Sequence, residues 1–332
     1  MVEDGLGRPL RDLRISVTDR CNFRCRYCMP RERFGDDHTF LPKRALLSFD
    51  QIERVVRACL PLGLTKVRIT GGEPLLRPQL PELCAKLSDL GIEVALTTNA
   101  SLLKSQAQDL AMSGLDRVTV SLDALEPELF QKMTDCAINV ETVLDGIESA
   151  IENNLDPIKV NCVVQHGVNE KEVPALVKHF RGTGVIVRFI EFMDVGRTNG
   201  WLPSQVVHSE TLLNYLQRDF DLIPVEPESP HDVATRWAHS DGSGEIGFIS
   251  SVSKPFCGDC VRARLSADGH LFTCLFASGG HDLRAIIHSD CPIDEITDAV
   301  SAVWSRRNDK YSELRSSKTT SLPRIEMSYI GG

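Results

Sequence analysis

Two short segments of the chain each carry three closely spaced cysteines. They are Cys21, Cys25 and Cys28 in the first segment, and Cys257, Cys260 and Cys274 in the second. Thiolates bind zinc and iron–sulfur clusters. A closed structural zinc site generally takes four protein ligands, whereas a four-iron cluster held by three cysteines leaves one iron open to another ligand. The first segment therefore favours a cluster, while the second, taken alone, fits zinc equally well.

Zinc remains the alternative for both segments, because a distant side chain could supply a fourth ligand. His38 could complete the first group, and Cys291 or His270 could complete the second. The cysteines that stand alone are expected to pack as small apolar side chains. They are Cys59, Cys84, Cys136, Cys162 and Cys291. No disulfide framework is expected, because the start of the sequence lacks an export signal.

Composition narrows the class of protein. Of the 332 residues, 42% are hydrophobic, which is enough for a substantial core. With 37 basic and 46 acidic side chains the net charge is −9, which disfavours a nucleic-acid-binding surface but allows a local basic pocket for one nucleotide. No apolar stretch approaches the roughly 18 residues of a membrane span. We therefore expect a cytoplasmic protein that binds neither nucleic acid nor a membrane.

The elements that would position the cysteines alternate regularly. β-type runs occur at residues 13–17, 67–70, 94–97, 118–122, 158–164 and 185–190. A helix follows each run, the first opening with a capping box of Ser48 and Gln51 and later ones expected at 79–90, 103–113, 140–153 and 170–181. Six β/α units predict a parallel sheet covered by helices. Periodicity leaves two forms open, an incomplete barrel and an open doubly wound sheet.

Polar and glycine residues follow five of these strands. They occupy residues 21–28, 71–73, 97–99, 121–123 and 191–193. In parallel α/β proteins these strand ends form the active-site edge. After about residue 220 a proline-rich stretch breaks the alternation, so the sequence predicts one region at 1–220 and a smaller one at 221–332.

Five stretches together resemble one protein family. They are LRISVTDRCNFRCRYCMP from residue 13, VRITGGEPLLR from residue 67, VRFIEFMDVG from residue 187, FCGDCVRARL from residue 256, and the final pair Gly331 and Gly332. The similarity runs from about Arg11 to Gly332 and points to the GTP 3′,8-cyclases of molybdenum cofactor biosynthesis, in the radical S-adenosylmethionine (SAM) superfamily. Two departures are Ala100, where the family usually has glycine, and the pair Asp135 and Cys136.

The resemblance implies a fold and its cofactors. The fold would be an incomplete (βα)6 TIM-type barrel at 1–220, with a C-terminal α+β extension at 221–332 carrying a second iron–sulfur cluster. Each of two [4Fe-4S] clusters would be held by three cysteines, and the first would bind SAM beside Tyr27, Gly72, Ser121 and Met193. Glycine suits position 72 because the missing Cβ lets a ligand approach the main chain. For Met193, core packing is the alternative.

The resemblance also implies GTP as the substrate, whose ribose loses its 3′ hydrogen before C3′ joins C8 of guanine. The implied GTP contacts are Arg14, Arg68, Thr97, Lys159, Arg262, Ala263 and Arg264. No catalytic side chain is implied beyond the clusters, and Arg14 is a candidate for positioning the substrate. Gly331 and Gly332 would enter the active site behind a strand predicted at 325–330, with a frayed end as the alternative.

Expected partners are a one-electron donor such as flavodoxin or ferredoxin, the cyclic pyranopterin monophosphate synthase that takes the product, and a second copy in a homodimer. Two other functions remain open from sequence. One is a radical SAM enzyme that modifies peptides or proteins and carries an auxiliary cluster. The other is a non-catalytic metal-binding or redox-sensing module, which would have no need of residues 71–74 or the arginines.

Overall fold

The computed structural model describes residues 1–229, 231–315 and 323–332. Within this part of the chain, one sheet of twelve strands has six parallel strands at its centre. These are β1 (Asp12–Ser16), β2 (Lys66–Thr70), β3 (Glu93–Thr98), β4 (Arg117–Ser121), β5 (Lys159–Val164) and β6 (Ile186–Glu191). They lie side by side in chain order. A doubly wound sheet would reverse its order at a switch point, so the unbroken order identifies the incomplete (βα)6 barrel.

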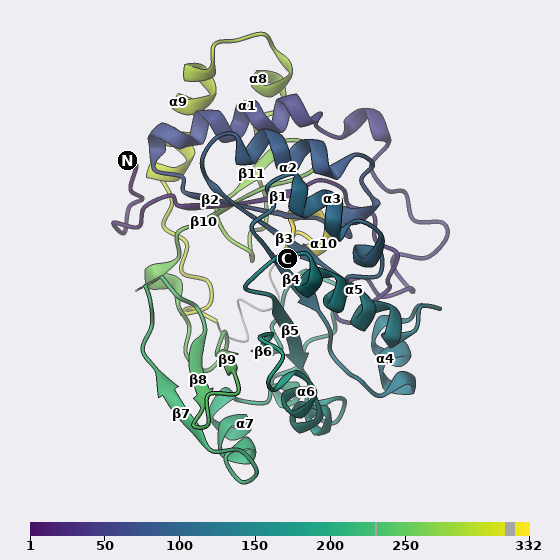
Figure 1. Cartoon of the computed structure of the whole chain (residues 1–332). Coiled ribbons are helices and arrows are strands. Elements are labelled where there is room, and N and C mark those ends of the chain that lie inside the picture. Colours follow the sequence, from purple (N-terminus) through teal and green to yellow (C-terminus); the bar gives the residue numbers. More distant parts are fainter. Residues whose placement is uncertain (230, 316–322) are drawn as a thin grey trace.

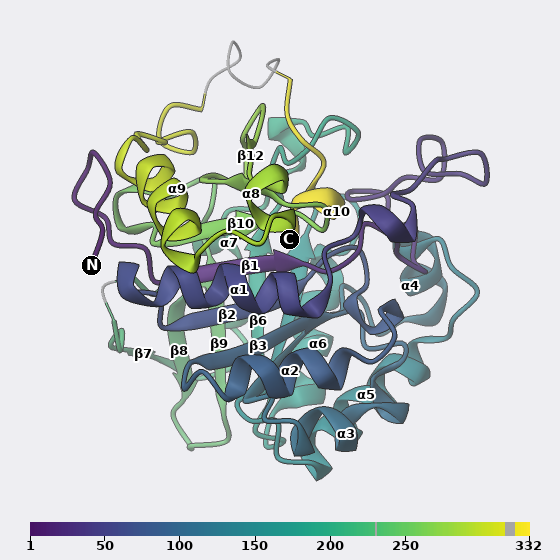
Figure 2. The same ribbon diagram turned by 90° about the horizontal axis from the view of Figure 1, so that it is seen from above.

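Helices cover the outer face of these strands (Figures 1 and 2). They are α1 (Phe49–Cys59), α2 (Leu80–Ser88), α3 (Ala107–Met112), α4 (Pro127–Thr134), α5 (Val140–Glu152) and α6 (Val173–Phe180). The predicted capping box of α1 is confirmed: Ser48 Oγ accepts the backbone N–H of Gln51 at 3.1 Å, and Gln51 Oε1 accepts that of Ser48 at 2.8 Å. Among the described residues, no helix is long and apolar enough to cross a membrane.

Two helix predictions differ from the structure. The helix expected at 103–113 is divided into a 3-10 turn (Leu103–Ser105) and α3, because Gln106 leaves the helical region between them. α4 was not predicted, although its start signals are present. Pro127 occupies its first turn, and the Glu126 side chain accepts the backbone N–H of Leu129 at 2.7 Å.

The C-terminal part extends both edges of the barrel sheet (Figure 1). On one side lie β7 (Leu222–Val225), β8 (Thr235–His239) and β9 (Glu245–Ile249), and on the other β10 (Arg262–Leu265), β11 (His270–Phe272) and β12 (His281–Asp282). β9 pairs in parallel with β6, and β10 pairs in parallel with β1. The accompanying helices are α7 (Ser209–Leu216), α8 (Arg284–His288) and α9 (Ile293–Ser305). One sheet therefore runs across the division predicted at residue 220, which stays a prediction.

The period of two along a strand separates core from cavity. In β1, the side chains of Leu13 and Ile15 are fully buried in the hydrophobic core. Arg14 between them points to the opposite face of the sheet, which is the inside of the barrel. The same alternation places Arg68 of β2 inside and its apolar neighbours Val67 and Ile69 in the core. Alternate residues of these strands therefore fulfil two roles: the apolar side chains pack in the core on the outer face, and the charged side chains line the cavity inside the barrel.

The strand predicted at 325–330 is wrong. Residues Met327–Ile330 form the short helix α10, with Ile330 fully buried. So short a run, in which apolar residues alternate with Glu326 and Ser328, fits either a strand or a helix, and tertiary contacts decide between them. Neighbouring β1 is already paired on both sides, by β2 and β10, and so offers no edge to another strand.

Candidate active site

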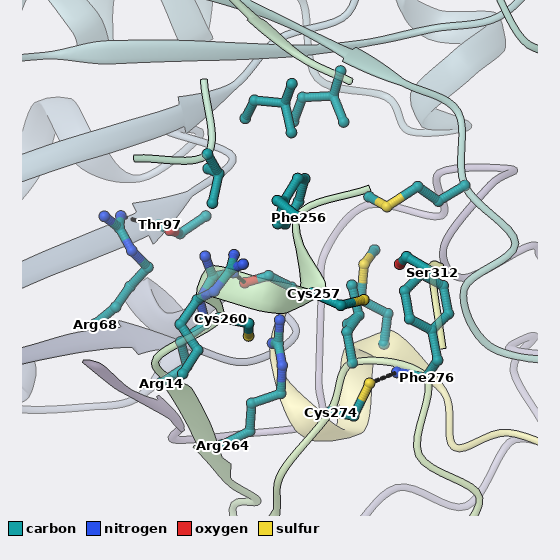
Figure 3. A pocket seen from close by; sticks show the side chains of 18 of the residues that line it. Arg14, Arg68, Thr97, Phe256, Cys257, Cys260, Arg264, Cys274, Phe276 and Ser312 are labelled. Carbon is teal, nitrogen blue, oxygen red and sulfur yellow. Dashed lines mark hydrogen bonds between the residues drawn. The ribbon is translucent and has the colours of Figure 1, made fainter. Parts of the chain in front are cut away.

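Three arginines lie in one row across neighbouring strands. Arg14 of β1 is opposite Arg264 of β10 on one side and Arg68 of β2 on the other. All three line a cavity of about 260 Å³ inside the barrel, and Figure 3 shows them around the same space. Like charges on cross-strand neighbours repel each other. An anionic ligand would offset this repulsion.

Burial and neighbouring positive charges lower the pKa values of the arginines at this cavity. Burial, and then Arg262, lowers the pKa of Arg264 to about 10. Burial and the neighbouring Arg264 lower the pKa of Arg14, and burial lowers that of Arg68. The pKa of Arg188, on β6, falls to about 9 through burial and then through Arg68. The arginines on the cavity wall therefore hold positive charges close together, and a bound polyanion would stabilise their charged forms.

Arg188 also lines the cavity, although it is not among the contacts predicted from the sequence. Its Nε donates to Asn161 Oδ1 at 2.9 Å, while Arg68 Nη1 donates to Thr97 Oγ1 at 3.2 Å (Figure 3) and to Thr119 Oγ1 at 3.1 Å. The signal that could have found Arg188 is the one that found Arg68, a charged residue inside an apolar strand. Polar residues of β3, β4 and β5 thus hold the arginines in place.

The remaining residues predicted to contact GTP or SAM do not all line the arginine cavity. Lys159 of β5 is not among the residues that line the cavity. Its pKa falls to about 8 through burial and then through Arg188. Arg262 lies on the wall, whereas the Ala263 side chain is buried in the core on the other face of β10. Met193 lines the arginine cavity, not the cavity of the first cysteine group.

The second cysteine group opens onto the arginine cavity. Cys257, Cys260 and Cys274 all line it (Figure 3). Burial alone would raise the pKa of Cys260, but Arg262 and Arg307 lower it to about 6. Three thiols beside cations form a donor set that fits an anionic iron–sulfur cluster.

The side chains that zinc would need at either group have other partners. His270 Nδ1 lies 3.2 Å from Asp268 Oδ1, and Cys291 Sγ donates to the Ile286 carbonyl at 3.3 Å. His38 packs between two phenylalanine rings, with centroids 4.7 and 4.6 Å away. These placements favour three-cysteine groups over four-ligand zinc sites.

The first cysteine group lines a second cavity. Cys21, Cys25 and Cys28 share it with Tyr27, Gly71, Gly72, Glu73, Ser121 and Asp123. Burial, and then Glu73, raises the pKa of Cys21 to about 12, and burial raises the pKa of Cys25. Metal ligation would displace these thiol protons. Three half-buried thiols on one loop again fit a cluster with one open iron.

The glycine pair at 71 and 72 also allows a close contact between two loops. A Cβ on Gly71 would collide with the carbonyl oxygen of Thr18, and one on Gly72 with that of Arg20. Gly72 donates its N–H to the Thr18 carbonyl at 2.7 Å. Glycine is needed at both positions because residues 71–72 lie against the backbone of residues 18–20. The latter segment runs directly into the first cysteine loop.

The two cavities meet at the C-terminal end of the sequence. Tyr27, Thr97, Ser121, Met327 and Gly332 line both of them. Arg14 Nη1 donates to the carbonyl of Gly332 at 2.7 Å, and Arg264 Nη1 donates to that of Gly331. Figures 1 and 2 place the C-terminus next to the central strands, not at the periphery. The final glycines therefore lie between the two candidate cofactor regions.

Comparison with known proteins gives the class. The Radical SAM superfamily matches residues 15–180, and Molybdenum Cofactor Synthesis C matches residues 185–313. Streptococcus suis SuiB bound to precursor peptide SuiA has a TM-score of 0.61 at 17% identity, covering 90% of this chain and 64% of that chain, which shows the fold alone. The barrel, the cysteine loop and the superfamily match together define a radical SAM enzyme, a class that uses a [4Fe-4S] cluster and SAM.

Relatives matched over nearly their whole length give the family. Proteins named GTP 3′,8-cyclase from Xanthomonas axonopodis pv. citri and Acidothermus cellulolyticus are 52% and 48% identical to this chain. Each comparison covers 100% of this chain and 99% of the relative. The chain belongs to the GTP 3′,8-cyclase family.

Proposed function

We propose that this enzyme converts GTP to (8S)-3′,8-cyclo-7,8-dihydroguanosine 5′-triphosphate, the first step of molybdopterin synthesis, in the arginine cavity. The observation that carries this proposal is the row of Arg264, Arg14 and Arg68, whose buried charges face a cavity also lined by three cysteines. A nucleoside triphosphate supplies both the negative charge that this row needs and a base that can reach the cysteine end.

The first cluster would be held by Cys21, Cys25 and Cys28. When bound, it supplies one electron that cleaves SAM and yields a 5′-deoxyadenosyl radical. The chain's part is to hold SAM in the second cavity, with Tyr27, Gly72 and Ser121 on its wall. Met193, on the wall of the neighbouring cavity, would reach SAM from the substrate side.

A second cluster would be held by Cys257, Cys260 and Cys274. When bound, it offers the guanine ring an iron that has no protein ligand. Arg262 lies beside this group, with its guanidinium 5.2 Å from the centre of the Phe256 ring. Both side chains narrow the cavity at its cysteine end, which would help to orient a flat base.

The positive side chains would bind the triphosphate. Arg68, Arg188 and Lys159 are contributed by three parallel strands, and each has a pKa lowered by burial. Arginine forks pair well with phosphate oxygens. Thr97 would hold Arg68 in its bound orientation, and the backbone at Ala263 would contact the substrate. Distributed anchors of this kind fix the ribose relative to both ends of GTP, which is a task of positioning.

The final glycines would order this arrangement. Arg14 and Arg264 both donate to their carbonyl groups. Gly331 and Gly332 would thereby set the direction of two arginines next to the substrate. A donor such as flavodoxin or ferredoxin would supply electrons, cyclic pyranopterin monophosphate synthase would take the product, and a homodimer is the proposed assembly.

The test is anaerobic reconstitution with iron and sulfide, followed by incubation with SAM, a reductant and GTP. We expect a cyclised dihydropurine triphosphate that requires both SAM and GTP. The matched control is Cys84→Ala, which removes a fully buried cysteine of the core and not one of the six candidate ligands. SAM cleavage without any cyclised product in the unaltered protein would contradict the proposed substrate.

A further inference from the structure

A buried network of three charged residues lies behind the second cysteine group. Arg8 Nε donates to Asp4 Oδ2 at 2.7 Å, and Arg307 Nη1 donates to the same oxygen at 3.1 Å. The residues are only 3, 7 and 4% exposed for Arg8, Asp4 and Arg307. One carboxylate therefore joins two guanidinium groups from opposite ends of the sequence.

Both arginines also hold the backbone of the cysteine segments. Arg8 Nη1 donates to the carbonyl of Cys257 at 2.6 Å, and Arg307 Nη1 donates to that of Cys260 at 2.6 Å. Arg307 Nε donates to the carbonyl of Thr273, directly before Cys274, at 3.0 Å. Each segment that carries a cysteine of this group is thus tied to the network.

Arg8 has one donor nitrogen left for the cavity. Its Nη2 is buried and has no hydrogen-bond partner among the described residues, and the Arg8 side chain lines the cavity together with the three cysteines. The Trp304 indole fixes both arginines, because its N–H donates to the Arg8 carbonyl at 3.0 Å and its ring lies 4.6 Å from the Arg307 guanidinium carbon.

Cations outnumber their paired carboxylates around the second cysteine group. Arg8, Arg307 and Arg262 supply three guanidinium groups. Asp4 and Asp309 supply two carboxylates, with Asp309 Oδ2 3.5 Å from Arg307 Nε. Positive charge and N–H donors beside a cluster favour its reduced, more negative form.

We propose that Asp4, Arg8 and Arg307 position the second cluster and raise its reduction potential, with Arg8 Nη2 donating to one of its sulfurs. The inference rests on the second cluster of the proposed function. Arg307 is a positioning residue that acts through the cysteine loop and through charge, and Arg8 does the same while also donating directly to the cluster. Asp4 opposes them electrostatically while holding them in place.

The experiment is a potentiometric titration of the anaerobic holoenzyme followed by electron paramagnetic resonance, using the signal that changes when GTP is added. Arg8→Met should lower the potential of that signal, and Asp4→Asn should raise it. Arg8→Lys, which keeps the charge, should lie between Arg8→Met and the unaltered protein. Arg284→Met is the control, because this exposed arginine pairs with Asp282 and should leave the potential unchanged.

Iron retention is the second measurement. A chelator should strip the second cluster from Arg8→Met at roughly 10- to 100-fold lower concentration, while the first cluster stays bound. Loss of the second cluster alone supports the positioning role, even if no potential can then be measured. Shifts of one sign in Arg8→Met and Asp4→Asn, an unchanged potential with full iron, or equal loss of both clusters would overturn the inference. Only four irons in the unaltered protein would instead count against the second cluster itself.

Discussion

Arg14 Nη1 donates to the carbonyl oxygen of Gly332 at 2.7 Å, which joins the first strand of the barrel to the last residue of the sequence. Arg14 also lies opposite Arg264 in the sheet, and Arg264 binds the carbonyl of Gly331. Backbone oxygens therefore accept from two guanidinium groups that lie side by side on paired strands of the cavity wall. The position of the final glycines and the charge of the site are coupled through these two contacts.

Deleting Gly331 and Gly332 should sharply reduce cyclised product. Iron content and uncoupled SAM cleavage should remain largely intact. The carbonyl groups of Gly331 and Gly332 accept from Arg264 and Arg14, not from the loops that carry the cysteines. Iron analysis and chromatography of the nucleosides measure the two effects separately. A short extension after Gly332 should have the same result. Unchanged product yield in both variants would favour the alternative that the final glycines are a frayed end with no role in the reaction.

Gly331→Ala should lower product formation more than Gly332→Ala. Gly331 has a φ of +78°, and a Cβ there would collide with Cγ2 of Thr70. A side chain in this backbone region costs on the order of 1 to 3 kcal/mol. At Gly332 the nearest atom to a new Cβ is Met327 Sδ at 3.3 Å, on a flexible side chain that can move. Equal product yields from the two variants, at equal iron content, would argue against a constrained tail.

The intact protein should carry about eight irons, two four-iron clusters. Cys25→Ala should abolish SAM cleavage, because Cys25 belongs to the group beside the SAM cavity. Cys274→Ala should keep some uncoupled SAM cleavage but form no cyclised product. Iron and sulfide analysis, with both product assays, checks this division. Identical behaviour of the two variants, each with its remaining cluster intact, would show that the roles are assigned wrongly.

Affinity for GTP should fall as pH rises above about 8. The pKa of Lys159 in the free protein is about 8, below its ordinary value, because burial and then Arg188 disfavour its charge. A bound triphosphate favours the charged amine and raises that pKa again, so binding above pH 8 requires proton uptake. The dissociation constant should then rise by up to about tenfold per pH unit, as one pKa unit corresponds to 1.36 kcal/mol.

Lys159→Arg is the matched control for this pH effect, since arginine stays charged over the same range. The dissociation constant of GTP should be measured for both proteins under anaerobic conditions from pH 7 to 9.5. Ionisation of guanine affects both proteins equally, so a difference between the two curves reports on residue 159. Parallel curves for lysine and arginine would exclude Lys159 as the titrating group.

Arg188→Met should weaken GTP binding much more than SAM binding. Loss of a charged hydrogen-bond donor costs on the order of 1.5 to 3 kcal/mol, about 10- to 150-fold in affinity. Arg181→Met is the comparison, because Arg181 is an exposed arginine that pairs with Asp241 on the surface. Equal weakening of both ligands by Arg188→Met would indicate a damaged barrel.

The barrel was predictable because its strands are local and strongly apolar. The run at 67–70 has three apolar or β-branched residues around Arg68, and that one charge already pointed to the cavity. The same reasoning applied to the strand at 185–190 would have found Arg188. What the sequence could not supply was register, which alone sets Arg264, Arg14 and Arg68 in one row.

Long-range contacts explain most of what was missed. Arg8 meets the Cys257 loop although 249 residues separate them, and no local pattern announces such a pair. The backbone at Ala100 was flagged by the family's usual glycine, and its φ of +60° shows why glycine is common there. Residues 325–330 resemble a strand because apolar residues alternate with Glu326 and Ser328, but this pattern does not show whether a free sheet edge is nearby.

The three strands added at each end of the barrel sheet also affect how the protein behaves outside its reaction. The outermost strands are β7, with four residues including Pro224, and β12, with two residues. Proline has no N–H to donate, and two residues cannot template another strand. The long central strands, which would otherwise invite pairing between molecules, therefore have no open edge. Concentrated solutions should consequently resist β-type aggregation as long as the C-terminal strands stay paired.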